Sequence, residues 1–149
     1  MTSEREQIAE TVTALVEEVS GWSHVTTDEH RFGGTEFRIG PREFGHVHAW
    51  GMLDIAFFRG LRDQLVAEEL TGVHHLLAES GWTTFHVESP DDYDRARWLL
   101  RLSYLSQLQT LKRTPAGREE FADVAVEAEV ADMGLSDDLR RAFERRTPA

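Results

Sequence analysis

Two histidines in this chain have the residue type and the spacing that could do chemistry. His46 and His48 lie in the stretch from Glu43 to Trp50, a short run in which apolar and polar residues alternate before a glycine. Successive side chains of a strand point to opposite faces, so both imidazoles share one face and lie roughly 6 to 7 Å apart. That separation suits joint action on one anion, one proton or one metal ion.

The same alternation predicts which neighbours share the histidine face. It places Phe44 and Trp50 on that face, where the indole of Trp50 could form the wall of a pocket. The opposite face takes Glu43, Gly45 and Val47. The structural alternative is that both histidines are polar strand residues that hydrogen-bond to their neighbours.

Asp54 lies beyond the turn at Gly51 and could bring a carboxylate to the two imidazoles. A metal ion needs three well-placed ligands, and the spacing of the histidines secures only two. A His/His/Asp metal site and a general-acid pair therefore both stay open. The sequence indicates no particular cofactor or metal.

Three further residues are candidates for the ligand-binding face. His74 is preferred to its neighbour His75, because His75 follows the alternation of the apolar residues around it. Arg31 precedes a Gly-Gly turn and Arg42 begins the histidine strand, and a guanidinium suits planar carboxylates or phosphates. For both arginines a solvated salt bridge is the structural alternative.

Composition and the N-terminal residues exclude several classes. The chain has 149 residues and no cysteine, which excludes disulfides, thiolate metal sites and cysteine nucleophiles. The first ten residues include four charged side chains and no apolar run that resembles a signal peptide, and no stretch approaches the ~20 apolar residues of a membrane span. We therefore expect a cytoplasmic protein without a membrane anchor.

The charge balance is strongly acidic. Aspartate and glutamate total 27 against 16 lysines and arginines, a net charge of −11, and Lys112 is the only lysine. A GC-rich genome replaces lysine by arginine, whereas adaptation to molar salt adds surface carboxylates. The acid excess together with the lysine depletion favours a halophilic protein. A general attraction to nucleic acid or to anionic membranes is not expected.

Hydrophobic periodicity predicts an α+β fold. We expect a single domain with an antiparallel meander sheet of four or five strands, packed against an N-terminal helix and a long central helix. The expected helices cover residues 3–20, 59–70 and 90–111, and the expected strands cover 25–30, 35–39, 42–50, 52–58 and 82–87, with a short extended piece at 73–77. Residues 1–113 form the main body. Residues 114–149 form a C-terminal extension of two short helices, after a break at 114–117, that packs on the body or on a partner.

Four stretches carry a family resemblance: HRFGGTEF, REFGHVHAWGMLDIAF, GVHHLLAESGWTTF and ARWLLRLSY. Over about residues 22–111 the chain resembles the small luciferase-family proteins of the haloarchaeal or actinobacterial type, which are described by a luciferase domain. By its label this resemblance implies oxidative chemistry, and it brings no catalytic residues to assign. The order of helix, meander and long helix also resembles the YjbR fold, which implies a nucleic-acid-associated role.

Three functional classes follow from these observations. The first is a non-enzymatic domain that binds a small ligand or a protein partner through the histidine face. The second is a metal-dependent or oxidative enzyme that uses His46 and His48. The third is a YjbR-like module, which the acidic charge disfavours as a nucleic-acid binder. Whether the protein is an enzyme is left open by the sequence. Separately, the sequence leaves a homodimer open.

The acidic composition generates a testable prediction. If it is an adaptation to high salt, the melting temperature rises as potassium chloride approaches molar concentration, because the Debye length falls to about 3 Å and carboxylate repulsion is screened. Thermal melts at low and high potassium chloride measure this. A melting temperature that stays constant or falls would assign the composition to codon usage.

Overall fold

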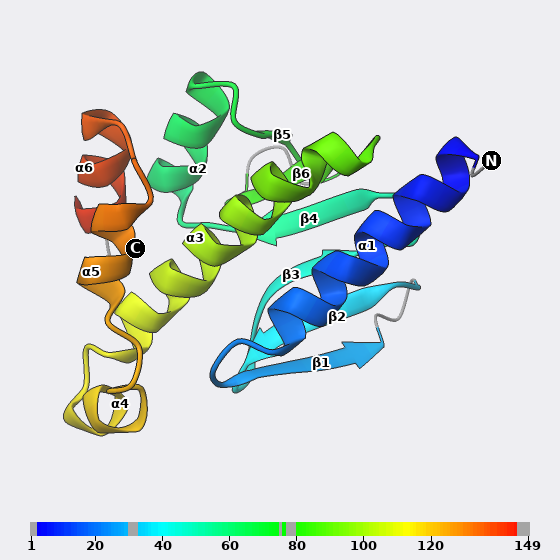
Figure 1. The fold of residues 1–149 in the computed structure, drawn as a ribbon. Helices are drawn as coiled ribbons and strands as arrows, with labels where there is room; N and C mark the ends of the chain where they lie inside the picture. Colours follow the sequence, from blue (N-terminus) through cyan, green and yellow to red (C-terminus); the bar gives the residue numbers. More distant parts are fainter. Residues whose placement is uncertain (1–2, 30–32, 75, 77–79, 146–149) are drawn as a thin grey trace.

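Six antiparallel strands form one open sheet, and helices α1 and α3 lie side by side across it (Figure 1). The architecture is that of a computed structural model, in which residues 3–29, 33–74, 76 and 80–145 are described. The strand order is β1-β2-β3-β4-β6-β5, so the first four strands form the meander that the sequence predicts. The α+β class is confirmed.

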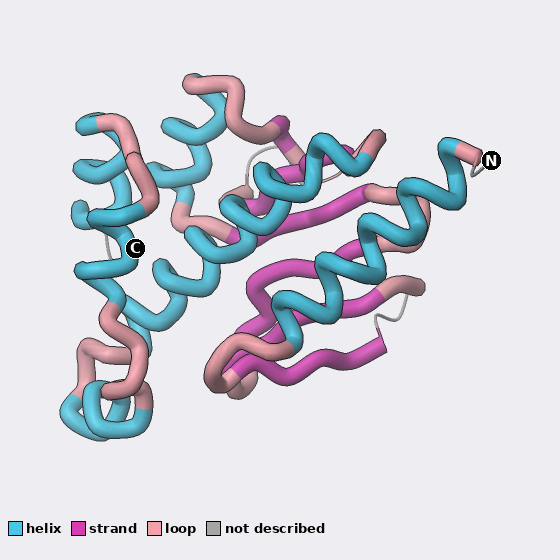
Figure 2. The backbone as a smooth tube through the Cα atoms, viewed as in Figure 1, coloured by secondary structure: helices cyan, strands magenta, loops and turns pink. Residues whose placement is uncertain are grey.

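The sheet contains more strands than the four or five expected, because the short extended piece at residue 73 also pairs. The strands are β1 (Val25–Glu29), β2 (Thr35–Ile39), β3 (Arg42–Val47), β4 (Met52–Ala56), β5 (Gly72–Val73) and β6 (Trp82–His86). The helices are α1 (Glu4–Ser20), α2 (Arg59–Ala67), the 3-10 turn η1 (Pro90–Asp92), α3 (Tyr93–Leu111), α4 (Pro115–Glu120), α5 (Val126–Asp132) and α6 (Asp137–Arg145). Figure 2 shows the same path with helices and strands distinguished by colour.

Hydroxyl side chains fix the starts of three helices. The Ser3 hydroxyl accepts the backbone N–H of Glu6 at 3.2 Å, which satisfies one of the free donors at the start of α1. Ser89 does the same for η1, which leads into α3, and Ser136 accepts the N–H of Leu139 at 3.0 Å in α6. The local sequence therefore determined where these helices begin.

A β-bulge at Phe44 changes which side chains of β3 face the core. Phe37 pairs with Gly45 and Arg38 pairs with Glu43, so Phe44 is an extra residue between two pairs. The Phe44 ring turns to the core and lies 6.0 Å from that of Phe37. The prediction that Phe44 shares the histidine face is therefore wrong, and Glu43, expected on the core face, turns to the histidines instead. Simple alternation fails because a bulge shifts the phase of the strand by one residue.

Helix α3 is the central element of the core, as the sequence predicts. Its residues are buried on several sides, and it contacts β3, β4, α1 and α5. Two of its polar side chains also hold neighbouring segments: the Ser103 hydroxyl donates to the Ala56 carbonyl at 2.5 Å, and the Tyr104 hydroxyl donates to the Ser23 carbonyl at 2.7 Å. Gly45 lets α3 approach β3, since a Cβ there would lie 2.7 Å from Leu100.

The connection from β4 to β5 places β6 between them. Both β4 and β5 are antiparallel to β6, so they are parallel to each other and are joined through α2. Helix α2 ends at Ala67, short of the predicted end at residue 70, because Glu69 adopts a positive φ of 58°. Gly72 is instead the first residue of β5.

The C-terminal extension contains three helices where two were expected. The segment 114–117, interpreted as a break, starts α4: Thr114 accepts the N–H of Gly117 at 3.0 Å, and Pro115 occupies the first helical position. The extension packs on the body, because α5 contacts α3 and α6 contacts α2. Its apolar side chains, such as Phe121, Leu139 and Phe143, belong to the same core.

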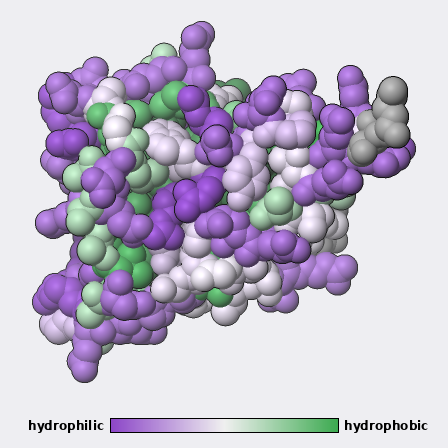
Figure 3. All heavy atoms as spheres, in the orientation of Figure 1, coloured by the Kyte–Doolittle hydropathy of each residue, from purple (hydrophilic) through white to green (hydrophobic). Residues whose placement is uncertain are grey.

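The helical side of the molecule presents mainly hydrophilic residues in the view of Figure 3, with apolar residues gathered near the C-terminal helices. No described helix is both long enough and apolar enough to cross a membrane.

The turn between β3 and β4 generates a prediction about stability. Gly51 has a φ of 98°, and an added Cβ would lie 2.1 Å from the Val87 carbonyl oxygen. We expect Gly51→Ala to destabilise the fold by more than ~1 kcal/mol, because both the conformation and the contact exclude a side chain. Gly60→Ala is the matched control, since an added Cβ there meets nothing within 4 Å. Urea unfolding measures both variants, and equal effects would contradict the prediction.

Candidate functional site

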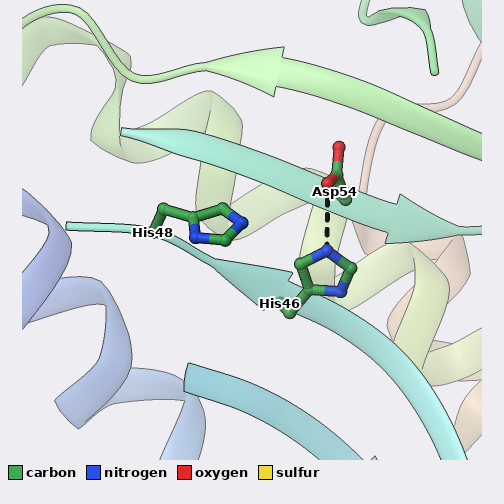
Figure 4. A group of neighbouring side chains, drawn as sticks. All are labelled: His46, His48 and Asp54. Atoms are coloured by element: carbon green, nitrogen blue, oxygen red, sulfur yellow. Dashed lines mark hydrogen bonds and ion pairs between the residues drawn. The ribbon is translucent and has the colours of Figure 1, made fainter. Parts of the chain in front are cut away.

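The neighbouring strands β3 and β4, with the residues that follow β3, bring two imidazoles and one carboxylate together. His46 pairs directly with Asp54 in the register of the two strands, and the distance from His46 Nε2 to Asp54 Oδ2 is 2.9 Å. His48 follows β3, and its ring centroid lies 5.8 Å from that of His46. Figure 4 shows both rings on the same side, with the ring of His48 extending toward His46 and Asp54. The predicted shared face of the histidines is confirmed, and Asp54 brings its carboxylate to His46 as the sequence analysis expected.

Both nitrogens of His46 face carboxylates. Nε2 faces Asp54, and Nδ1 lies 2.6 Å from Glu43 Oε2. The bulge at Phe44 makes the second contact possible, because it turns Glu43 to the histidine face. The His46 side chain is only 12% exposed, so the imidazole and its two partners form a largely buried network.

Asp54 is the centre of a second set of contacts. Its residue exposure is 1%, and its Oδ1 accepts the hydroxyl of Thr84 at 2.6 Å from the neighbouring strand β6. The Nε2 atom of His74 lies 3.6 Å from the same oxygen. The two carboxylate oxygens are thus divided, with Oδ1 toward β6 and Oδ2 toward His46.

His74 reaches this group from the edge of the sheet. Its side chain is buried, and its Nδ1 accepts the backbone N–H of Leu76 at 3.1 Å. In the neutral ring the proton is therefore on Nε2, the nitrogen that faces Asp54. The preference for His74 in the sequence analysis agrees with this position, whereas His75 lies outside the described residues.

Two tryptophans flank the polar group. Trp50 is 63% exposed and stacks on His48, with ring centroids 4.3 Å apart and planes inclined by 15°. The ring of Trp82 lies 5.5 Å from His46 and 6.3 Å from His74. The structure thus places Trp50 at the outer edge of the group, as expected.

The last two candidates are the arginines predicted to bind a ligand, Arg42 and Arg31. Arg42 pairs with Ile39 in the sheet, and its Nε donates to Gln107 Oε1 of α3 at 2.7 Å. The structure therefore directs it to the helical side, apart from His46. Arg31 lies outside the described residues.

Sequence reasoning missed three of the residues around the histidines. Thr84 and Trp82 alternate along β6, and they reach the site only because β6 pairs with β4. Glu43 was assigned to the wrong face because of the bulge. The alternation of side chains along β6 indicates that Thr84 and Trp82 share one face. No local pattern in the sequence indicates that β6 pairs with β4.

Electrostatics make His46 and Asp54 an ion pair. Burial alone lowers the pKa of His46, but the hydrogen bonds to Asp54 and Glu43 and their negative charges outweigh it and raise this pKa to about 9. For Asp54, burial raises the pKa, and the hydrogen bonds from His46 and Thr84 and the nearby histidine charges lower it to about 2. At neutral pH His46 is therefore an imidazolium and Asp54 a carboxylate.

This charge state limits the chemistry that His46 can perform. A general base works best with a pKa near the operating pH, and a residue whose pKa is about 9 is protonated in almost every molecule at pH 7. Glu36, which lies opposite His46 in the register and pairs with Arg38, adds a further buried carboxylate. The arrangement is suited to holding a polar or cationic group rather than to accepting a proton.

The comparison with protein families identifies residues 41–103 as matching the family model described as the Luciferase domain. The resemblance to this family is therefore confirmed over these residues, which make up less than half of the chain. No curated protein and no solved structure matches the chain. The matched segment contains His46, His48 and Asp54 together with Glu43, Thr84 and His74, whereas Glu36 and Arg38 precede it.

The ion pair predicts how stability depends on pH. The pKa of His46 is raised in the fold, so its contribution is complete below about pH 6.5 and is lost as the pH rises through about 9. The loss is ~3 kcal/mol over this interval, since each pKa unit corresponds to ~1.4 kcal/mol. The lowered pKa of Asp54 works in the other direction, and its contribution is lost as the pH falls from 3.8 through about 2. Both shifts report one shared interaction, so they are not summed.

Urea unfolding at a series of pH values, with a chelator present, measures this dependence. The double variant His46→Gln/Asp54→Asn keeps hydrogen-bonding groups but removes both charges. The free energy of unfolding of the wild type should fall between about pH 7 and 9, and that of the double variant should fall much less. His86→Gln changes an exposed histidine of β6, and its free energy of unfolding should fall with pH as that of the wild type does. Identical profiles for the double variant and the wild type would contradict the assignment.

Proposed function

We propose that this domain binds a small ligand through the polar group on the sheet face away from α1 and α3. The observation that supports this proposal most directly is the largely buried network of His46, Asp54 and Glu43. Desolvating such charges costs free energy, and replacing a buried ion pair by apolar residues is often neutral or stabilising. A network of this kind at one end of two strands is therefore better explained by a binding role than by stability.

An exposed aromatic side chain next to the polar group supports a binding role. The large exposed hydrophobic residues in the described part of the chain are Trp50, Val73 and Leu76. Of these, Trp50 stacks on His48, whereas Val73 pairs with Thr83 and lies on the opposite face of the sheet. A few convergent polar groups beside exposed apolar surface are typical of ligand sites.

The local charge favours a cationic group in the ligand. Three carboxylates, from Glu36, Glu43 and Asp54, lie on this face, and the imidazolium of His46 and the guanidinium of Arg38 balance two of them. The chain as a whole carries a net charge of −11. Anionic ligands, including nucleic acid, are correspondingly disfavoured.

An enzyme that uses His46 and His48 is the second candidate. The match to the Luciferase domain supports an oxidative reading, because the site lies within the matched residues. The raised pKa of His46 argues against acid–base catalysis by this residue near neutral pH. The YjbR-like role, the halophilic origin, the cytoplasmic location and a homodimer stay predictions.

The contacts of His46 change which variant tests the site. Changing both histidines to glutamine looks mild from the sequence, yet removal of His46 leaves the buried carboxylate of Asp54 and the half-buried one of Glu43 without their cation. Removing one partner of a buried pair costs about 3–5 kcal/mol. His48→Gln is the better variant, because His48 lies at the edge of this network, under Trp50.

We expect native mass spectrometry of the wild-type protein to show a bound mass that denaturation releases. The bound mass should be lost from His48→Gln and retained by His86→Gln, with both variants keeping the wild-type circular dichroism. Trp50→Ala should weaken retention, because it removes the ring that covers His48. Equal retention by His48→Gln and the wild type would exclude the histidine face as the binding site.

A further inference from the structure

The geometry points to a binding site for one divalent first-row transition-metal ion, with His46, His48 and Asp54 as its ligands. This inference rests on the proposed function and names the chemical class of the ligand. One potential ligand atom from each of the three residues lies within 4.8 Å of the others. Two imidazole nitrogens and one carboxylate oxygen form a donor set that zinc and ferrous iron accept, and that leaves further coordination positions open.

The distances require only a small contraction. Zinc binds histidine nitrogen and carboxylate oxygen at about 2.0–2.2 Å, so tetrahedral ligand atoms lie about 3.4 Å apart. His46 Nε2 and Asp54 Oδ2 are 2.9 Å apart and need only open slightly around an ion. The three ligand atoms lie within 4.8 Å of one another, so His48 has to approach by at most about 1.4 Å, which a change in its side-chain torsions can provide.

Outer contacts already orient two of the ligands. Glu43 accepts from His46 Nδ1, which directs Nε2 toward Asp54, and this is the carboxylate–histidine–metal arrangement of many metal sites. The Thr84 hydroxyl holds Asp54 Oδ1, so that Oδ2 faces the histidines. His74 also lies on the Oδ1 side, which makes it a positioning residue rather than a ligand.

The charges of the site can accommodate the ion. On binding, the proton on His46 Nε2 is released to solvent, and the metal forms bonds to this nitrogen, to His48 and to Asp54. The ion then replaces one positive charge by two on a face that carries three carboxylates. Magnesium and calcium prefer all-oxygen ligands and should bind poorly.

Calorimetric titration of the chelator-treated protein with zinc chloride tests the proposal. We expect one ion per chain, and an affinity that falls as the pH is lowered from about 8 to about 6, since imidazole must be neutral to bind metal. His48→Gln should lose more than about 100-fold in affinity, and Thr84→Val, which removes an outer contact, about 10–100-fold. His86→Gln is the control and should bind as the wild type does, and magnesium chloride should give no comparable signal.

Cobalt chloride provides a readout that does not depend on folding of a variant. Wild-type protein with one equivalent of cobalt should show visible absorption of a four- or five-coordinate site, and zinc should remove it. Circular dichroism and thermal melts establish that each variant is folded before its affinity is compared. Equal zinc affinity in His48→Gln and the wild type, or binding no tighter than about 1 mM, would overturn the proposal.

Failure of the metal site and failure of ligand binding give different results. If an organic mass stays bound after chelator treatment while zinc does not bind, the metal site is excluded and the proposed function stands. If zinc binds through His46, His48 and Asp54, and removal of zinc leaves native mass spectra without any other bound mass, the metal site is supported and binding of an organic ligand is excluded.

Discussion

The hydrogen-bonded ion pair between His46 and Asp54 joins the two strands on which the site depends. It forms because the two residues are direct partners in an antiparallel register, and it persists because Glu43 and Thr84 occupy the remaining atoms of the imidazole and the carboxylate. A shift of β3 against β4 by one residue would send His46 to the core face and break its contacts with Asp54 and Glu43. The turn at Gly51 holds the register of β3 with β4, and the bulge at Phe44 belongs to the register of β3 with β2.

The ion pair between His46 and Asp54 fits a functional role better than a purely structural one. A buried imidazolium between carboxylates is stable as an ion pair, yet the fold gains little by burying these charges instead of apolar side chains. The proton on His46 and a metal ion compete for the same nitrogen, and the carboxylates attract either one. Glu43 serves both states, because it accepts from Nδ1 whether Nε2 holds a proton or a metal.

The helices support the site from the opposite face of the sheet. Helix α3 packs on β3 and β4, and Ser103 hydrogen-bonds the backbone of β4 at Ala56, which fixes both strands from below. The C-terminal helices add to the same core through α2 and α3, so the region outside the Luciferase-domain match contributes packing to the segment that carries the site. The site itself requires residues of β3, of the turn that carries His48 and Trp50, of β4 and β6, and of the segment around His74.

The sequence by itself determined the features that depend on neighbours along the chain. Serine caps and periodicity located α1 and α3, and strand alternation with a short turn brought His46, His48 and Asp54 to one face. The tertiary structure decided what depends on pairing between distant segments. The bulge that reverses Phe44 and Glu43 exists only in the register with β2, and Thr84 and Trp82 reach the histidines only because β6 inserts between β4 and β5. The pKa values of His46 and Asp54 follow from these contacts, because burial and hydrogen bonds, rather than residue type, set the cost of each charge.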